Sequence, residues 1–191
     1  MTICLNSINF IGVFLASIFI SYILYIKIKR NYTFSYVCVR TLYIVFFICI
    51  TIFPITILSK SELNQLHQEF GEYLRYYQLV PFKTILGVGS YNFFRQIICN
   101  ILLFVPMPVF VKISHKTFSG LKVILICVGC SLLLETVQLG INVITRYPSH
   151  VCDIDDFILN STGVIIGYLL YFVANKISIV QKISNRLIYE K

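Results

Sequence analysis

The residues best able to do chemistry are acids and amides that lie within otherwise apolar stretches of the sequence. Glu135, Gln138 and Asn142 follow one another at spacings of three and four, so they share one face of a helix. Two further stripes have helical spacing: Asp153, Asp156, Asn160, Gly163 and Gly167 in one, and Asn92, Gln96 and Asn100 in the other. Carboxylates in such stripes could exchange protons with a substrate or hold Mg²⁺ through their oxygens, with Asp153, Asp156 and Glu135 as candidate ligands.

Composition places these stripes in a membrane protein. The 191 residues are 58% hydrophobic and 13% charged, with a mean hydropathy of +0.83. A soluble domain of this size needs far more polar surface to cover its core. The apolar residues also come in blocks of about twenty, the length of a helix that crosses the hydrocarbon layer. We therefore expect one membrane domain with lipids as its immediate partners.

The apolar blocks predict an all-α, polytopic membrane helix bundle of about five transmembrane helices. Their expected ranges are 5–28, 34–58, 91–113, 121–144 and 155–175. No basic stretch precedes the first block and no A-x-A-like site follows it, so we expect a retained helix there. Segment 61–78 has leucines and aromatic residues at helical spacing, with Ser61 as a plausible N-cap. It predicts a short helix at the outer interface, and a plain surface loop is the alternative.

Charge distribution predicts the orientation in the membrane. The net charge is +8, but Lys and Arg gather at helix ends, where they contact lipid headgroups, and this pattern excludes nucleic acid as a partner. The connections after the first and third spans are basic, whereas those after the second and fourth carry the acids. By the positive-inside rule we expect the N-terminus outside and the C-terminus in the cytoplasm.

The polar stripes are expected to meet in one pocket. At about 1.5 Å per residue, Asn100 and Glu135 lie roughly 12–15 Å below the outer helix ends, and Asn160 about half as deep. A carboxylate facing lipid costs about 2.5–3.5 kcal/mol or more, so these acids should turn inward and find partners. Gln138, Arg95 and Arg146 are the candidate partners of Glu135.

A purely structural interpretation competes with this one. Polar side chains within spans often only tie helices together, and Gly163 and Gly167 allow close helix contact. Asp153 and Asp156 open a helix, where capping and the helix dipole favour acids, and this explanation is strongest for Asp155, which lies off the stripe. His150 could carry protons or bind a metal, although a lone loop histidine usually does neither. No cofactor can be named from the sequence.

Several of these residues also match a family pattern. Leu79-Val80-Pro81-Phe82, the run from Asn100 to Pro106, Glu135-x-x-Gln138 and the stripe from Asp153 to Gly167 resemble, in this order, the VanZ-like family of bacterial membrane proteins. The resemblance covers about residues 79–172. Matching positions are Pro81, Phe82, Asn100, Pro106, Glu135, Gln138, Asp153, Asp156, Asn160 and Gly163. Many family members have a glycine at the position after Pro106, where this chain has Met107-Pro108. Many also have a basic residue just before the first aspartate, and here His150 is the nearest such residue.

The resemblance implies a multi-pass protein of the bacterial cell membrane, in a family whose namesake is associated with low-level teicoplanin resistance. We divide the chain into an N-terminal transmembrane pair with its outer connection (1–78), a VanZ-like core (79–175) and a basic cytoplasmic tail (176–191). The first functional hypothesis is a pocket outside the cytoplasm that binds a lipid-linked envelope precursor or a lipoglycopeptide. The alternative is an enzyme that uses paired carboxylates, with or without Mg²⁺, on such a precursor. A proton-coupled transporter is a third possibility.

Overall fold

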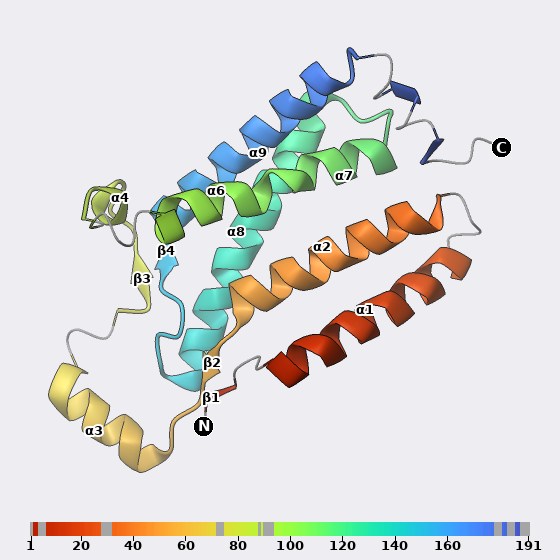
Figure 1. The fold of residues 1–191 in the computed structure, drawn as a ribbon. Coiled ribbons are helices and arrows are strands. Elements are labelled where there is room, and N and C mark those ends of the chain that lie inside the picture. Colours follow the sequence, from red (N-terminus) through yellow and green to blue (C-terminus); the bar gives the residue numbers. More distant parts are fainter. Residues whose placement is uncertain are drawn as a thin grey trace.

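The computed structural model describes residues 2–3, 7–27, 32–71, 75–87, 89, 94–177, 181–182 and 186–187, and shows long helices joined by shorter connections (Figure 1). The helices are α1 Ser7–Lys27, α2 Phe34–Ile52, α3 Lys60–Phe70, α4 Lys83–Gly87, the π-helical turn η2 Phe94–Ile98, α6 Cys99–Phe104, α7 Pro106–Ser114, α8 Gly120–Thr145 and α9 Ile154–Ala174. Strand β1 Thr2–Ile3 pairs antiparallel with β2 Ile55–Thr56, and β3 Tyr77–Gln78 pairs parallel with β4 Cys152–Asp153.

The prediction of a polytopic membrane helix bundle is confirmed. Within the described residues, four helices are long and apolar enough to cross a membrane: Phe34–Ile52, Gln96–Ser114, Gly120–Thr145 and Ile154–Ala174. The segment Gly12–Lys27 of α1 is apolar but shorter. Several large apolar side chains on these helices are exposed, as expected of surfaces that face lipid. This protein is therefore a multi-pass membrane protein.

Two expected helices end earlier than predicted. α2 ends at Ile52 rather than at residue 58, because the chain turns at Phe53 into strand β2. α3 begins after Ser59, not Ser61: the Ser59 side chain accepts from the Glu62 backbone, and the Glu62 carboxylate accepts from the Ser59 backbone. This capping box fixes the helix start. α3 ends at Phe70, and residues 77–78 are extended in β3.

Helix α9 packs closely against α6 and α7 through two small residues. A Cβ atom on Gly163 would collide with the carbonyl of Ile101, and one on Gly167 would collide with the carbonyl of Val105. The predicted close contact at this G-x-x-x-G is confirmed, and it brings the polar stripe of α9 against the third span. Beside it lies a buried core formed by Phe104, Val123, Cys127, Leu134 and Val164.

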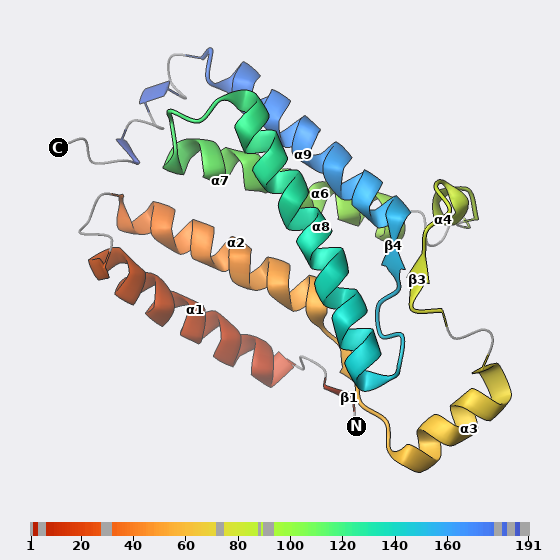
Figure 2. The same cartoon turned by 180° about the vertical axis from the view of Figure 1, so that it is seen from behind.

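The α1–α2 hairpin lies beside this core, as both views show (Figure 1, Figure 2). Side-chain hydrogen bonds connect it to the other helices. The Tyr43 hydroxyl donates to the Leu103 carbonyl at 2.8 Å, and the Gln138 amide donates to the Thr51 carbonyl at 2.9 Å. The second contact lies near the end of the bundle at which α8 ends and α9 begins, which we call the acidic end.

Candidate functional site

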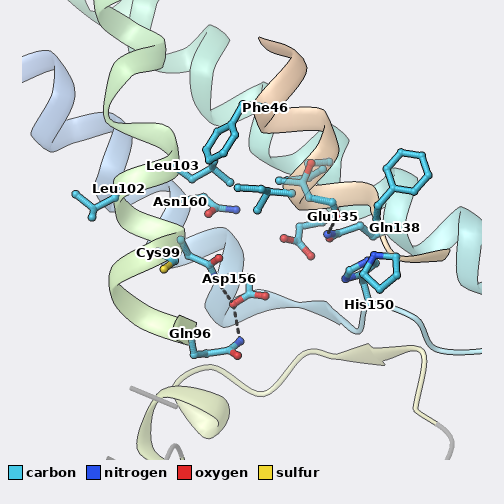
Figure 3. A pocket seen from close by; sticks show the side chains of 16 residues that line it. Phe46, Gln96, Cys99, Leu102, Leu103, Glu135, Gln138, His150, Asp156 and Asn160 are labelled. Atoms are coloured by element: carbon cyan, nitrogen blue, oxygen red, sulfur yellow. Dashed lines mark hydrogen bonds between the residues drawn. The ribbon is translucent and has the colours of Figure 1, made fainter. Parts of the chain in front are cut away.

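Asp156 is held by two amide side chains from the third span. Gln96 lies in η2 and Asn100 in α6, and their nitrogens donate to Oδ1 of Asp156 at 3.0 and 2.6 Å (Figure 3). A π-helical turn widens the helix by one residue and is frequent at functional sites. Here it carries one of the two donors. The third and fifth spans are thus joined at the acidic end by a carboxylate with two amide partners.

Glu135 faces the same region from α8. Glu135 is only 5% exposed, and its Oε2 accepts the backbone N–H of Asp153 at 3.1 Å. The Cys152 thiol also hydrogen-bonds to this carboxylate. The pKa of Cys152 is raised mainly by burial and, to a smaller extent, by the nearby Glu135 carboxylate. Figure 3 shows Glu135 and Asp156 directed into one cavity. The start of the fifth span therefore supplies partners for Glu135.

Of the two arginines expected beside Glu135, the structure describes the side chain of Arg146 but not that of Arg95. Arg146 ends α8 in a left-handed conformation, with φ 55, and is exposed. Its backbone carbonyl accepts from the Tyr76 hydroxyl at 3.1 Å. Arg95 belongs to η2, but its side chain lies outside the described residues. A role of either arginine in the pocket stays a prediction.

A deep cavity of about 520 Å³ lies between α2, α6, α8 and α9. Its polar lining residues are Gln96, Asn100, Glu135, Gln138, His150, Asp156 and Asn160. Its apolar lining includes Phe46, Ile50, Leu102 and Leu103. The structure thus brings residues of the three predicted stripes together around one space, whereas the predicted Asn92 lies outside the described residues. That this space is a functional site stays a prediction.

A second space, the mouth cavity, adjoins the first at the helix ends. Its volume is about 510 Å³, and Gln96, Gln138, His150 and Asp156 line both cavities. Arg75 and Asp153 belong to the mouth cavity only. The shared residues show that the two spaces lie next to each other at the acidic end of the bundle.

Asn160 and Asn142 are both buried but differ in their hydrogen-bond partners. Asn160 is 3% exposed and lines the deep cavity, and its Oδ1 is buried with no hydrogen-bond partner among the described residues. Asn142 is fully buried, donates to the His150 carbonyl and accepts the His150 backbone N–H at 3.4 Å. Asn142 therefore holds the connection between α8 and α9, while Asn160 leaves an acceptor unsatisfied.

Asp153 acts as the N-cap of α9. One carboxylate oxygen accepts the Asp155 backbone N–H at 2.9 Å, and the other accepts the Thr84 hydroxyl at 2.5 Å. Both oxygens thus have partners within the protein. This geometry agrees with capping as the structural explanation of this acid.

Asp155, which the sequence pattern placed off the stripe as a helix-end acid, also has a second structural role. It is fully buried and accepts backbone N–H groups of Phe82, Thr84 and Ile85 at 2.5, 2.8 and 3.1 Å. Asp155 lies in the first turn of α9, as expected of a helix-end acid, and its carboxylate also anchors the start of α4. Phe82 has φ 63, which a bulky residue rarely adopts, and these bonds stabilise that turn.

The structure tests a metal site only in part. Among the described residues, no group of three His, Cys, Asp or Glu side chains is arranged to hold a metal ion. The predicted set of Asp153, Asp156 and Glu135 includes one acid whose two oxygens are already used. Magnesium binding stays a prediction.

Sequence reasoning missed the contacts that involve backbone groups. Asp155 bonds to three backbone amides, and Glu135 accepts one from Asp153. The signal that could have found the first is the Pro81-Phe82 pair, because a turn there exposes amides that need an acceptor.

Comparison with known proteins identifies the family of this chain. A protein-family model described as VanZ/LLP1 matches residues 40–175, more than half of the chain. The chain belongs to the VanZ/LLP1 family. The resemblance found in the sequence is thereby confirmed, and the region that matches the VanZ/LLP1 family contains every residue that lines the two cavities. No curated protein and no solved structure matches the chain.

Proposed function

We propose that this protein binds an amphiphilic molecule of the bacterial envelope, a lipid-linked precursor or a lipoglycopeptide, in its deep cavity. The observation that carries the proposal is the mixed lining of that cavity. Acids and amides of η2, α6, α8 and α9 surround one part, and apolar side chains of α2 and α6 form another. A polar headgroup and an apolar chain have complementary places in such a space.

The apolar wall supports entry from the lipid. Phe46 is 49% exposed, Ile50 is 50% exposed and Leu102 is 57% exposed, although all three line the cavity. Side chains that are half exposed and also line a cavity mark its edge. An amphiphile could thus enter between α2 and α6 while its chain remains in the bilayer.

The charge pattern supports an opening outside the cytoplasm. The connection from α7 to α8 carries Lys116 and Lys122 follows it, whereas the acidic end carries Asp153 and Asp155. The positive-inside rule then directs the acidic end outward, with the N-terminus outside and the C-terminus in the cytoplasm. A cavity at that end would meet envelope molecules.

Teicoplanin susceptibility and binding together test this proposal. Susceptible bacteria would express the wild type, Asp156→Asn, Glu135→Gln or the control Thr136→Ala, with equal membrane levels confirmed by immunoblot. Thr136 is exposed on α8 and is absent from the lining of both cavities. We expect the wild type and the control to lower susceptibility and to bind teicoplanin in nanodiscs. The two cavity variants should bind about tenfold or more weakly, because each removes a charged hydrogen-bonding group.

A second candidate function is an enzyme, and one observation favours it. Glu135 and Asp156 line one cavity from two helices, as a general acid and a general base would. Mass spectrometry of lipid-linked precursors separates the candidates. An enzyme would produce a species of altered mass that vanishes in Asp156→Asn, whereas a binder would enrich unaltered molecules in the purified protein.

A further inference from the structure

In the deep cavity the amide nitrogens donate hydrogen bonds within the protein, whereas the amide oxygens do not accept any from the described residues. Gln96 and Asn100 donate to the Asp156 carboxylate, and Gln138 donates to the Thr51 carbonyl. A carboxylate and a backbone carbonyl can only accept hydrogen bonds, so each amide must face its partner with its nitrogen. None of the three amide oxygens accepts a hydrogen bond from a described residue. Each amide nitrogen uses one of its two N–H groups in these bonds, while each amide oxygen keeps both lone pairs. The cavity therefore retains more acceptors than donors.

The two carboxylates add further acceptor capacity. Oδ1 of Asp156 receives both amides, and its Oδ2 accepts nothing from the described residues. Glu135 receives one backbone N–H and the Cys152 thiol. An ionised carboxylate offers about four lone-pair sites, so both groups can accept more bonds.

Asn160 points independently to a missing donor. Its side chain enters the cavity lining (Figure 3), its residue is 3% exposed, and its buried Oδ1 has no partner. Leaving a buried acceptor unsatisfied costs about 1–3 kcal/mol, so a native structure rarely does this without reason. A rotation of the amide would present this oxygen to a ligand with N–H groups in the cavity.

The cavity lining contains acids and, among the described residues, no Lys or Arg. Glu135 and Asp156 are the acids, and His150 lies in the same lining. Arg75 lines the mouth cavity but is exposed. A phosphate group entering this space would meet two carboxylates and few donors, whereas a cation would be attracted.

We infer that the polar part of the deep cavity takes a primary ammonium group carried on an apolar chain. This inference rests on the proposed function, because it names the headgroup of the amphiphile bound there. An ammonium group has three donors, no acceptor and one positive charge, which match Glu135, Asp156 and the unpartnered oxygen of Asn160. The chain lies along Phe46, Ile50 and Leu102.

Four probes with the same ten-carbon chain test the headgroup. The full-length protein in phosphatidylcholine nanodiscs would be titrated calorimetrically with decylamine, decyltrimethylammonium, decyl phosphate and decanol, and titrations of empty nanodiscs would be subtracted. The variants are Glu135→Gln, Asn160→Leu and the control Thr136→Ala. The glutamine retains an oxygen that can accept the Asp153 N–H, so this variant keeps the local fold.

We expect decylamine to bind about tenfold or more tightly than each other probe, because charge and three N–H donors act together. Both cavity variants should remove that preference, and Thr136→Ala should keep it. Equal binding of decyltrimethylammonium would overturn the assignment of a hydrogen-bond-donating head. Tighter binding of decyl phosphate that the cavity variants abolish would overturn the ammonium assignment and leave the proposed function standing. Binding of every probe that no cavity variant changes would overturn both.

Discussion

Oδ1 of Asp155, in the first turn of α9, lies 2.5 Å from the backbone nitrogen of Phe82. Its other oxygen accepts the N–H groups of Thr84 and Ile85. A single buried carboxylate thus satisfies the amides at the start of α4, and it fixes the segment that follows β3 to the fifth span. Thr84 in turn donates to Asp153, which caps the same helix. This connection places the loop beside the mouth cavity.

Asp155→Asn should destabilise the protein and release this segment. An asparagine has one acceptor oxygen, and its NH₂ group would face backbone donors, so we expect a loss of about 2–4 kcal/mol in the free energy of unfolding. Thermal unfolding in detergent measures the loss, and hydrogen exchange at Phe82, Thr84 and Ile85 locates it. The control is Asp156→Asn, which removes the neighbouring carboxylate without touching these amides. Unchanged exchange in Asp155→Asn would contradict the anchoring role.

The sequence was sufficient to predict the long helices. α8 spans Gly120–Thr145 where 121–144 was expected, and α9 spans Ile154–Ala174 where 155–175 was expected. Apolar runs of this length have few alternatives in a membrane, because every backbone group must bond within the segment. The stripes also identified which residues share a face, and those faces meet around the deep cavity.

The remaining details depend on contacts between distant segments. Residues 77–78 could have continued α3 on local periodicity, but they pair with 152–153 as a strand. The bonds from Asp155 to the start of α4 could not be predicted, because backbone amides give no characteristic side-chain pattern in a sequence. The bond from the Asp153 N–H to Glu135 was missed for the same reason. Tertiary pairing of backbone groups is not visible in a pattern of side chains.

Gly163→Ala should weaken the contact between α9 and α6. The added methyl group would meet the backbone carbonyl of Ile101, which cannot move aside as a side chain could. Overpacking of this kind costs about 1–3 kcal/mol, to be measured by thermal unfolding in detergent. Gly129→Ala on α8 is the matched control, because nothing lies within 4 Å of a Cβ atom there. Equal stability of the two variants would show that the helices are not in close contact at Gly163.

His150 should make stability depend on pH. Burial lowers the pKa of His150 below its ordinary value, and hydrogen bonds to the backbone of Ile52 and Pro54 only partly oppose this. The imidazole is therefore protonated more readily when unfolded, with a pKa of about 6.5. Its contribution is fully present above that pH and is lost as the pH falls from about 6.5 toward the lower folded value, by at most about 1.4 kcal/mol per pH unit.

Melting temperatures of the wild type and His150→Gln between pH 7.5 and 5.5 measure this effect. The wild type should lose more stability on acidification than His150→Gln. His67→Gln, which alters an exposed histidine on α3, should behave like the wild type. Parallel curves for the wild type and His150→Gln would contradict the prediction.

Labelling of Cys99 tests whether the deep cavity contains water and on which side of the membrane it opens. Both Cys99 and Cys130 are exposed, but Cys99 lines that cavity beside Asn100, whereas Cys130, on α8, is absent from its lining. Thiols react as thiolates, which form in water and not in hydrocarbon. In single-cysteine variants, a membrane-impermeant cationic thiosulfonate added outside intact cells should therefore label Cys99 and leave Cys130 unmodified. An anionic thiosulfonate should label Cys99 more slowly, because Glu135 and Asp156 repel it. Labelling of Cys99 only in inside-out vesicles would reverse the orientation, and labelling from neither side would mean that the cavity is closed to water.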